Sequence, residues 1–412
     1  MEKIIINGSR PLCGEVTVSG SKNAILPLIF ASLLVNGESI FYNVPDIGDV
    51  RVAIDIVSNL GAKVNFLNNR LSINTENLVY RDSDPALISK IRASTYLIGA
   101  SLARFGKAEV GEFGGCNFSL RPIDLHIKSA IALGAEVKEN YLIAKKLRGA
   151  KIYLEKPSVG ATVNTLIMSA AADGETEIYG YAKEPHIFCL IDYLSNAGLS
   201  ILVTNEKISI KGSTIHPIKY KVIGDMIEAG SYLVASIITD GEITVKGVNP
   251  IELSSFLDVL INMGYTPKAE KNSITVNSLK TKKASDNIII TAAPYPMFPT
   301  DLQPIMAPMI AKNGGGRIID TVWDARFGYL RSLSPFGIEY NFLGEGAYIK
   351  RSIIRNAITE ATDLRGGMSC VISALCARGR SEILSPSLIL RGYDSLIEKL
   401  SILGADIKLV NI

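Results

Sequence analysis

The sequence predicts an α/β (α+β) protein of two similar domains, each made of three repeated α/β units whose buried helices are enclosed by sheets. Two observations carry this prediction: glycines that recur along the whole chain, and helix-like stretches that are apolar on nearly all sides. The length agrees with it. At roughly 100–200 residues per domain, 412 residues form two or three domains, each large enough for a hydrophobic core.

Two series of glycines mark the repeat. In the first, a helix-like stretch ends in glycine and a strand residue follows four positions later; its members are Gly37, Gly106, Gly174, Gly241, Gly314 and Gly379, spaced by 69, 68, 67, 73 and 65 residues. The second series is Gly61, Gly134, Gly198, Gly264, Gly337 and Gly404, spaced by 73, 64, 66, 73 and 67 residues. Because both series have six members at similar spacing, we expect six copies of one unit of about 68 residues.

Each unit should contain a helix buried on all sides, a strand, an amphipathic helix and a return strand. The buried helix is apolar or small throughout, and its glycine supplies a left-handed stop. Examples are helices at 24–35 and 162–172, strands at 108–110, 176–179 and 243–245, an amphipathic helix at 52–60, and return strands at 62–66, 135–137 and 405–409. A unit this small cannot bury its own sheet face, so units should pack in threes. The crevice between two such domains is a usual ligand site.

Composition excludes several classes of protein. The mean hydropathy is +0.24, but the longest apolar stretch, residues 24–35, is shorter than the roughly 20 residues that cross a bilayer. The N-terminus turns polar at Asn7, too soon for a secretory signal. A net charge of +3 without a basic block argues against nucleic acid. Five cysteines without a C-x-x-C pair indicate a reducing cytoplasm and no structural zinc, so we expect a cytoplasmic protein without membrane insertion or metal.

Polar residues gather where the buried helices should begin, 13 to 15 residues before each glycine of the first series; these positions are Lys22, Arg92, Gly160, Glu228, Asp301 and Arg365. The neighbouring Ser21, Thr300 and Thr362 suit helix capping as well as function, and both interpretations stay open. Lys and Arg have the wrong sign for the positive end of a helix dipole. A cation at a helix N-terminus suits phosphate or carboxylate, which predicts a substrate with several negative charges.

One cysteine differs from the others in its surroundings. Cys116 follows Gly114 and Gly115 in an expected loop, and Arg121 nearby would favour its thiolate form. Pro122 and Asp124 suit the first turn of the helix that follows. The other internal cysteines, Cys189, Cys370 and Cys376, are better interpreted as small buried hydrophobes. The three histidines (His126, His186, His216) are interpreted as structural or surface residues, since no two show metal-ligand spacing.

Taken together, these segments resemble the enolpyruvyl transferase family, and within it the UDP-N-acetylglucosamine 1-carboxyvinyltransferases. The resemblance covers essentially the full length, and the order and spacing of the motifs make it specific. The matching segments are Gly20-Ser21-Lys22-Asn23-Ala24, Arg92-Ala93-Ser94, Gly114-Gly115-Cys116, Arg121-Pro122-Ile123-Asp124-Leu125-His126, Ser158-Val159-Gly160-Ala161-Thr162, Phe298-Pro299-Thr300-Asp301, Arg326-Phe327, Thr362-Asp363-Leu364-Arg365 and Arg391-Gly392-Tyr393.

The resemblance implies both a fold and a reaction. The fold is an inside-out α/β barrel, with an N-terminal domain at 21–224 that carries the cysteine loop, a C-terminal domain of residues 1–20 plus 225–412, and the active site in the cleft between them. The reaction is transfer of enolpyruvyl from phosphoenolpyruvate to the 3-hydroxyl of UDP-N-acetylglucosamine, with release of phosphate. It is the first committed step of peptidoglycan synthesis, hence of cell-wall growth, cell shape and division, and a target of fosfomycin. No metal or organic cofactor is implied.

The resemblance also implies roles for particular residues. Lys22, Arg121 and Arg391 match the cations that hold phosphoenolpyruvate, Asp301 matches the base that also holds the sugar, and Cys116 matches the acid that protonates the methylene carbon. Residues around the cleft are matched by Arg326, Asp363 and Arg365. Contacts to the nucleotide sugar are matched by Asn23, Arg92, Arg121, Pro122, Ile123, Asp124, Leu125, Lys156, Pro157, Ser158, Val159, Gly160 and Val322.

Four departures from the family pattern keep two alternatives open. Phe113, Met226, His186 and Leu390 stand where relatives often have proline, arginine, glutamate and an acidic residue. The acceptor could therefore be another nucleotide such as UMP, or the protein could be a non-catalytic paralogue that binds the UDP-sugar; a housekeeping and a second-copy role also remain open. The cysteine loop and the nucleotide-contact segments argue against the shikimate-pathway relative.

Overall fold

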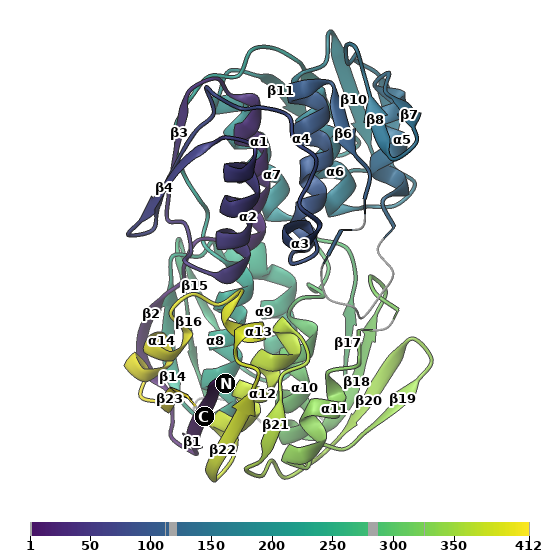
Figure 1. Cartoon of the computed structure of the whole chain (residues 1–412). Helices are drawn as coiled ribbons and strands as arrows, with labels where there is room; N and C mark the ends of the chain where they lie inside the picture. Colours follow the sequence, from purple (N-terminus) through teal and green to yellow (C-terminus); the bar gives the residue numbers. More distant parts are fainter. Residues whose placement is uncertain (1, 112, 115–121, 279–286, 325, 412) are drawn as a thin grey trace. The chain divides into compact units, whose positions relative to one another are not determined.

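The computed structural model describes residues 2–111, 113, 114, 122–278, 287–324 and 326–411. Cys116 and Arg121 lie outside the described residues. The chain forms two compact units: unit 1 combines Met1–Ser19 with Gly224–Ile412, and unit 2 is Gly20–Ile223 (Figure 1).

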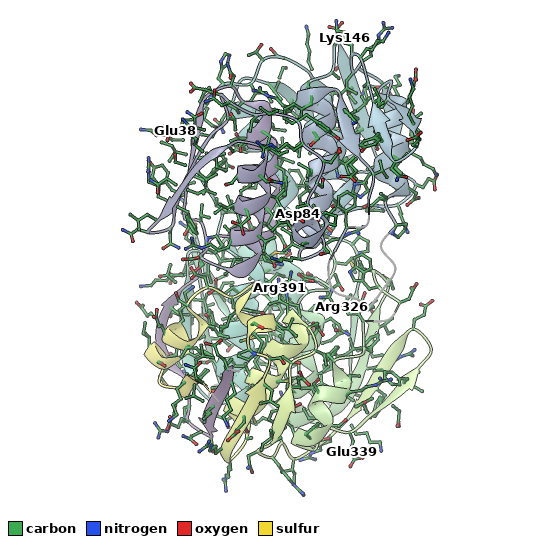
Figure 2. The ribbon with its side chains drawn as sticks, viewed as in Figure 1. Glu38, Asp84, Lys146, Arg326, Glu339 and Arg391 are labelled. Carbon is green, nitrogen blue, oxygen red and sulfur yellow. The ribbon has the colours of Figure 1, made fainter. Side chains whose placement is uncertain are left out.

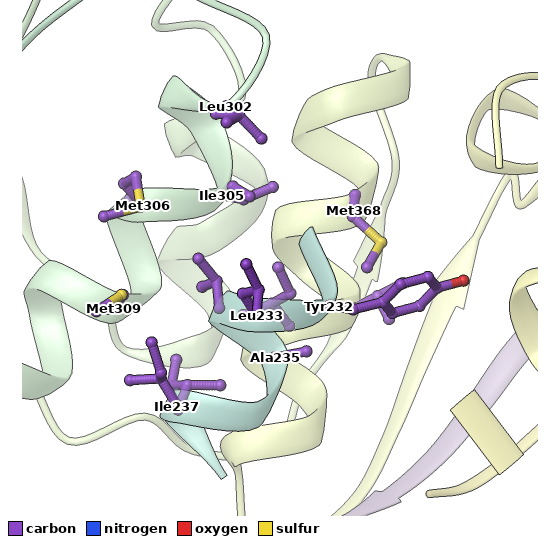
Figure 3. Packing of buried hydrophobic residues seen from close by; sticks show 14 of the residues in the cluster. Tyr232, Leu233, Ala235, Ile237, Leu302, Ile305, Met306, Met309 and Met368 are labelled. Atoms are coloured by element: carbon purple, nitrogen blue, oxygen red, sulfur yellow. The ribbon is translucent and has the colours of Figure 1, made fainter. Parts of the chain in front are cut away.

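Three buried helices occupy the centre of each unit. In unit 2 they are α1 (Lys22–Ala31), α4 (Tyr96–Phe105) and α6 (Val159–Ala170). In unit 1 they are α8 (Met226–Ile238), α10 (Gln303–Asn313) and α12 (Leu364–Cys376). Sheets surround each group of helices in Figure 1, and Figure 3 shows apolar side chains of α8, α10 and α12 packed against one another. The expected apolar helices are thus confirmed, and with them the fold class.

The sheets repeat one strand order. In each four-stranded sheet of the described residues, one outer strand is parallel to its neighbour and the remaining pairs are antiparallel. Unit 2 has β13 (Lys219–Lys221), β3 (Glu38–Tyr42), β5 (Arg70–Asn74), β4 (Lys63–Leu67); β9 (Lys151–Tyr153), β10 (Glu175–Tyr179), β12 (Lys207–Lys211), β11 (Ser200–Val203); and the antiparallel β6 (Lys107–Glu109), β8 (Tyr141–Ile143), β7 (Glu136–Lys138). Unit 1 has β2 (Cys13–Thr17), β14 (Glu242–Lys246), β16 (Ser273–Asn277), β15 (Lys268–Glu270); β17 (Ile288–Ala292), β18 (Gly315–Asp320), β20 (Gly346–Lys350), β19 (Tyr340–Leu343); and β21 (Ile358–Glu360), β22 (Gly379–Leu384), β1 (Glu2–Gly8), β23 (Asp406–Asn411).

The remaining helices are half-buried or short. Helix α2 (Gly48–Asn59) buries one face through Val50, Ala53, Ile56 and Val57, as its amphipathic pattern predicts, and begins four residues before the predicted start. The others are α5 (Asp124–Ala132), α7 (Pro185–Asn196), α9 (Ser254–Asn262), α14 (Leu396–Ile402), α3 (Pro85–Ile88), α11 (Leu330–Leu333), α13 (Ser387–Leu390), and the 3₁₀ helices η1 (Ser32–Leu34), η2 (Arg92–Thr95), η3 (Pro250–Leu253) and η5 (Ser334–Phe336).

The glycine series has the predicted left-handed backbone at every position except one. Gly37 and Gly106, for example, have φ of 136° and 71°. At Gly241 the prediction is wrong, because the left-handed residue is Asp240, with φ of 57°. Gly241 meets a different requirement: a Cβ there would lie 2.0 Å from the carbonyl oxygen of Leu12, so only glycine allows this approach of two backbones.

The N-terminal strand completes the sixth repeat. In the earlier repeats the return strand is followed by another strand that pairs with it, as β5 follows β4. For β23 that place is taken by β1, which lies between β22 and β23 with Ile4 opposite both Ile383 and Leu409. Sheet closure therefore joins the two ends of the sequence.

Among the described residues, no helix has the length and apolar character needed to cross a membrane. The longest described helices, α8 and α12, have 13 residues each.

Candidate active-site residues

The carboxylate of Asp301 lies between two guanidinium groups in unit 1. Arg326 Nη2 donates to Oδ1 at 2.7 Å, while Arg365 donates to Oδ2 from Nη2 at 3.1 Å and from Nε at 3.3 Å. The arginine side chains are only 7% and 4% exposed, whereas Asp301 is 28% exposed. Two buried cations thus hold one carboxylate that still reaches the surface, an arrangement suited to orienting a polar ligand group.

Asp320, at the end of β18, supports this cluster from one side. Its Oδ2 accepts from the Thr300 hydroxyl at 2.6 Å, and Thr300 Oγ1 accepts in turn from Arg326 Nη1 at 3.0 Å. Oδ1 of Asp320 accepts from the backbone N–H groups of Val322 and Trp323 at 2.9 and 3.1 Å. The same carboxylate therefore positions Arg326 and the backbone turn that contains Val322.

Arg365 is held at the start of α12. Asp363 caps that helix, because its Oδ1 accepts from the backbone N–H of Arg365 at 3.0 Å and of Gly366 at 2.9 Å. The Arg365 guanidinium lies 5.3 Å from the ring centre of Tyr393. Burial alone lowers the pKa of Arg365, but the neighbouring Tyr393, Asp301 and Asp225 outweigh it, and the net direction is upward. Arg365 is therefore a permanent cation in this site.

Arg391 follows α13 as its C-terminal capping residue and is half-buried. Figure 2 labels Arg391 and Arg326, both on unit 1. Tyr393, two residues further on, is buried, and its ring lies beside the guanidinium of Arg365.

In unit 2, Lys22 opens α1 beside a buried acid. Its Nζ lies 3.1 Å from Oδ2 of Asp49, which stands in the first turn of α2. The two side chains are 14% and 8% exposed. An adjacent carboxylate offsets the unfavourable sign of a lysine at a helix N-terminus. Asn23, the next residue of α1, is half-buried.

Arg92 opens η2 and acts on a buried histidine. Burial is the main cause that lowers the pKa of His126 to about 4. The charge of Arg92 lowers it further, while Asp124 opposes the shift. Asn164 Nδ2 lies 2.6 Å from His126 Nδ1 and also donates to the Thr95 carbonyl at 3.0 Å. Because the Asn164 Oδ1 accepts from the Gly99 N–H at 2.7 Å, the amide is fixed as the donor, and neutral His126 carries its proton on Nε2.

Two further segments of unit 2 contain predicted nucleotide-sugar contacts. Pro122 and Ile123 precede α5, Asp124 is its first residue, and Leu125 is buried. Lys156 and Pro157 are exposed before α6. Ser158 caps α6, since its Oγ accepts from the Ala161 N–H at 3.3 Å; Val159 and Gly160 form the first turn.

Helix capping is the wrong interpretation for Ser21, Thr300 and Thr362. Ser21 precedes α1 without a capping side-chain bond. Thr300 bonds to Asp320, and α10 has no side-chain cap. Asp363, not Thr362, caps α12. Asp363 is the better cap for α12 because its carboxylate accepts from two backbone N–H groups.

The residues at which the sequence departs from the family pattern lie in both units, Phe113 and His186 in unit 2 and Met226 and Leu390 in unit 1. Phe113 is half-buried, His186 is buried in α7, Met226 is the first residue of α8, and Leu390 is the last residue of α13. Within the described part of the chain, no group of three His, Cys, Asp or Glu side chains is placed to hold a metal ion.

The structure thus brings Asp301, Arg326 and Arg365 into direct contact. Asp363 accepts from the backbone N–H of Arg365, whereas Val322 donates its backbone N–H to Asp320. Sequence reasoning missed Asp49, Asp320 and the pairing of His126 with Asn164. Asp49 lies in the first turn of α2 as observed, but precedes the amphipathic helix predicted at 52–60, so that prediction did not include it. Nothing in the local sequence indicates that Asp320 would meet Thr300.

Comparisons with known proteins identify the family. The model of the family described as EPSP synthase (3-phosphoshikimate 1-carboxyvinyltransferase) matches residues 6–400. The chain is 40% identical over 417 residues to UDP-N-acetylglucosamine 1-carboxyvinyltransferase of Halothermothrix orenii, with all of both chains covered. It is 39% identical over 420 residues to UDP-N-acetylglucosamine 1-carboxyvinyltransferase 1 of Streptococcus agalactiae, again over all of both chains.

Two solved structures share the fold. The enolpyruvyl transferase NikO from Streptomyces tendae has a TM-score of 0.88 at 22% identity, covering 100% of this chain and 99% of that one. EPSP synthase from Acinetobacter baumannii has a TM-score of 0.74 at 17% identity, with both chains fully covered. Identity over the full length to the 1-carboxyvinyltransferases and the match to the family model lead to one conclusion: this chain belongs to the enolpyruvyl transferase family, among the relatives named UDP-N-acetylglucosamine 1-carboxyvinyltransferase.

Proposed function

We propose that this protein transfers the enolpyruvyl group of phosphoenolpyruvate to the 3-hydroxyl of UDP-N-acetylglucosamine and releases inorganic phosphate. The observation that carries the proposal is the Asp301 carboxylate held by Arg326 and Arg365, in a chain 40% identical over its full length to a protein named for this activity.

The reaction proceeds in two steps in this proposal. The sugar oxygen bonds to C2 of phosphoenolpyruvate while Asp301 takes the hydroxyl proton, and Cys116 delivers a proton to the methylene carbon C3. The resulting ketal then loses a proton from C3 and phosphate from C2, which restores the double bond. Lys22, Arg121 and Arg391 hold the phosphate and carboxylate, since cations and guanidinium forks bind both groups well.

The acceptor is held, in the same proposal, by segments at helix starts. A pyrophosphate and a nucleotide suit Arg92, Lys156–Gly160 and the run Arg121–Leu125, because helix starts present free N–H groups and these segments add cations. Asn23 and Val322 complete the set.

The proposed active site draws residues from both units, because Lys22 and Arg92 belong to unit 2 and Asp301 and Arg391 to unit 1. We therefore expect it in the cleft between two domains, and the nucleotide sugar should draw them together. Small-angle scattering with and without saturating UDP-N-acetylglucosamine tests this arrangement; identical curves would count against it.

The reaction would serve peptidoglycan synthesis in the cytoplasm, where both charged substrates are made. A membrane-impermeable nucleotide sugar requires the enzyme to lie in the same compartment as its synthesis. Fractionation of the producing cells, with activity followed in each fraction, tests the location.

Phosphate release is the decisive experiment. The purified full-length protein is incubated with phosphoenolpyruvate and UDP-N-acetylglucosamine, beside Cys116→Ala and Asp301→Ala. Asp406→Asn is the matched control, since Asp406 also pairs with an arginine of unit 1, Arg10, but at the surface. Release by the wild type and by the Asp406 variant alone supports the proposal. Release no faster than in the Cys116 and Asp301 variants would refute it.

An acceptor panel separates the alternatives. A preference for UMP over the UDP-sugar would point to a different nucleotide acceptor. Tight calorimetric binding of the UDP-sugar without turnover of any acceptor would point to a non-catalytic binding protein.

A further inference from the structure

We infer that Tyr393 is a positioning residue that holds the Arg365 guanidinium against Asp301. The inference rests on the proposed function, because Asp301 is there the base. Tyr393 follows Arg391 by two residues, yet its contacts lead to a different part of the site.

The hydroxyl of Tyr393 has a fixed direction. Ser231 on α8 donates its single hydroxyl proton to the Ile227 carbonyl at 2.7 Å. The Ser231 oxygen also lies 2.8 Å from the Tyr393 oxygen. Since Ser231 has no second proton, Tyr393 must be the donor in this contact. Burial raises the pKa of the Tyr393 hydroxyl, so the donor proton is retained at neutral pH.

A hydroxyl that donates toward Ser231 turns its lone pairs away from it. Arg365 interacts with this hydroxyl electrostatically, because each group shifts the pKa of the other, and its guanidinium carbon lies 5.3 Å from the Tyr393 ring centre. Tyr393 and Arg365 are 2% and 3% exposed, so little water is present to compete for the guanidinium. The aromatic ring and the hydroxyl oxygen therefore restrict the rotamers of Arg365 electrostatically as well as sterically.

The consequence reaches Asp301 because Arg365 has little freedom to move without changing its bonds. Both Nε and Nη2 donate to Oδ2, so a rotation of the guanidinium changes both bonds. Ser231 lies on α8, Arg365 lies on α12, and Asp301 lies in the turn before α10. Tyr393 thus couples the buried helix α8 to the orientation of the proposed base.

Unit 2 supplies a matched control residue. Tyr193 is also fully buried, and its hydroxyl oxygen also contacts a serine hydroxyl, that of Ser39, at 3.5 Å. Its ring packs against Phe41 and Tyr220 rather than an arginine. Tyr→Phe removes the same atom from a buried tyrosine beside a serine at both sites. The sites differ in the arginine contact and in the serine distance, which is 2.8 Å for Tyr393 and 3.5 Å for Tyr193.

The test compares Tyr393→Phe, Ser231→Ala and Tyr193→Phe in the full-length protein. In the phosphate-release assay we expect Tyr393→Phe to lower kcat about tenfold, with KM for both substrates within about twofold of wild type. Ser231→Ala should act in the same direction, and Tyr193→Phe should leave kcat unchanged. With an active wild type, equal kcat in the two tyrosine variants overturns the inference.

A second measurement does not depend on activity. The side-chain Nε–H resonance of Arg365, assigned by its loss in Arg365→Lys, should exchange slowly with solvent in the wild type and at least about tenfold faster in Tyr393→Phe. Tyr193→Phe should leave it unchanged. An unchanged Arg365 resonance in Tyr393→Phe overturns the positioning role, whereas an inactive wild type with the expected resonance changes overturns only the proposed reaction.

Discussion

Arg365 donates from two of its nitrogens to a single oxygen of Asp301, with distances of 3.1 and 3.3 Å to Oδ2. Arg326 binds the other oxygen. Each guanidinium therefore binds one carboxylate oxygen, and together they fix the orientation of the carboxylate plane.

Asp301→Asn should abolish phosphate release and also destabilise the protein. The amide keeps the shape but cannot accept a proton or neutralise two guanidinium groups, and one of its ends would direct N–H donors at a cation. We expect a loss of about 1–3 kcal/mol in the free energy of unfolding, because the site is only partly exposed. Urea unfolding checks it, with Asp406→Asn as the control; equal stability of the two variants would contradict the cluster's role in folding.

Lys22 and Asp49 should separate stability from activity. Lys22→Ala removes the ammonium group beside a buried carboxylate, and we expect a loss of about 1–3 kcal/mol. Adding Asp49→Asn should recover most of that loss, because the remaining amide is neutral. Activity should stay absent in the double variant, since the cation for phosphoenolpyruvate is still missing. Recovery of phosphate release together with stability would show that Lys22 acts only in folding.

His126 should make the protein less stable in mild acid. Its pKa in the fold is about 4, below the ordinary 6.5, so between these pH values the unfolded chain binds a proton that the fold does not. Stability therefore falls as pH falls through 6.5 toward 4. Between pH 7.5 and pH 5 the contribution is about 2 kcal/mol.

The check is urea unfolding at the two pH values. His126→Gln should lose less stability than wild type on acidification, by about 2 kcal/mol, while His216→Gln, at an exposed position, should keep the wild-type pH dependence. Parallel curves for wild type and His126→Gln would contradict the assignment of a neutral buried histidine.

Lys399 and Glu228 form a buried pair beside Ser19. Lys399 Nζ donates to Glu228 Oε1 and to Ser19 Oγ, each at 2.6 Å, and the Ser19 N–H donates to Glu228 Oε2 at 2.8 Å. Burial raises the pKa of Glu228 to about 7, although Lys399 opposes the shift. Lys399→Met should destabilise the protein by about 3–5 kcal/mol at pH 8.

The loss should be smaller at pH 6, because a Glu228 carboxyl that keeps its proton bears no buried charge. Lys399→Met with Glu228→Gln should recover stability at pH 8. Thermal unfolding of the four proteins at both pH values measures the coupling. A Lys399→Met effect independent of pH would show that the lysine acts by packing alone.

Cys116 should form a covalent adduct with fosfomycin when the UDP-sugar is bound. The epoxide is opened by the sulfur of a reactive thiolate, so the protein mass should rise by one inhibitor. Cys116→Ala should prevent the mass change, whereas Cys13→Ala, which removes an exposed cysteine of β2, should not. A wild type without adduct would remove the claim of an accessible thiol.

The repeat was predictable because its signals are local. Glycine at a left-handed position and an apolar helix surface are properties of short segments, and Gly37 or α6 could be placed within a few residues. The exception at Gly241 arises from contact with Leu12, a residue far away in sequence. A close approach of two backbones leaves the same mark in sequence as a left-handed turn.

The site was predictable in its members and not in its pairings. Lysine and arginine at helix starts break a local rule, which marks Lys22, Arg92 and Arg365 individually, whereas Asp301 is marked by its place in the repeat. Asp301 meets Arg326 and Arg365 across 25 and 64 residues of chain, and those partnerships depend on how α10 and α12 pack. Asp49 was missed because the predicted helix began at residue 52, after Asp49, whereas α2 begins at Gly48.

The position of β1 between β22 and β23 sets an order for synthesis. The ribosome makes β1 first and its two partners last, so unit 2 can be complete while the first strand still lacks both neighbours. Unit 2 is an insertion between two segments of unit 1 that already meet, since the Asp225 N–H donates to the Ser19 carbonyl at 2.9 Å. In a polypeptide that joins Ser19 directly to Gly224, fewer residues would separate the synthesis of β1 from that of its partners β22 and β23.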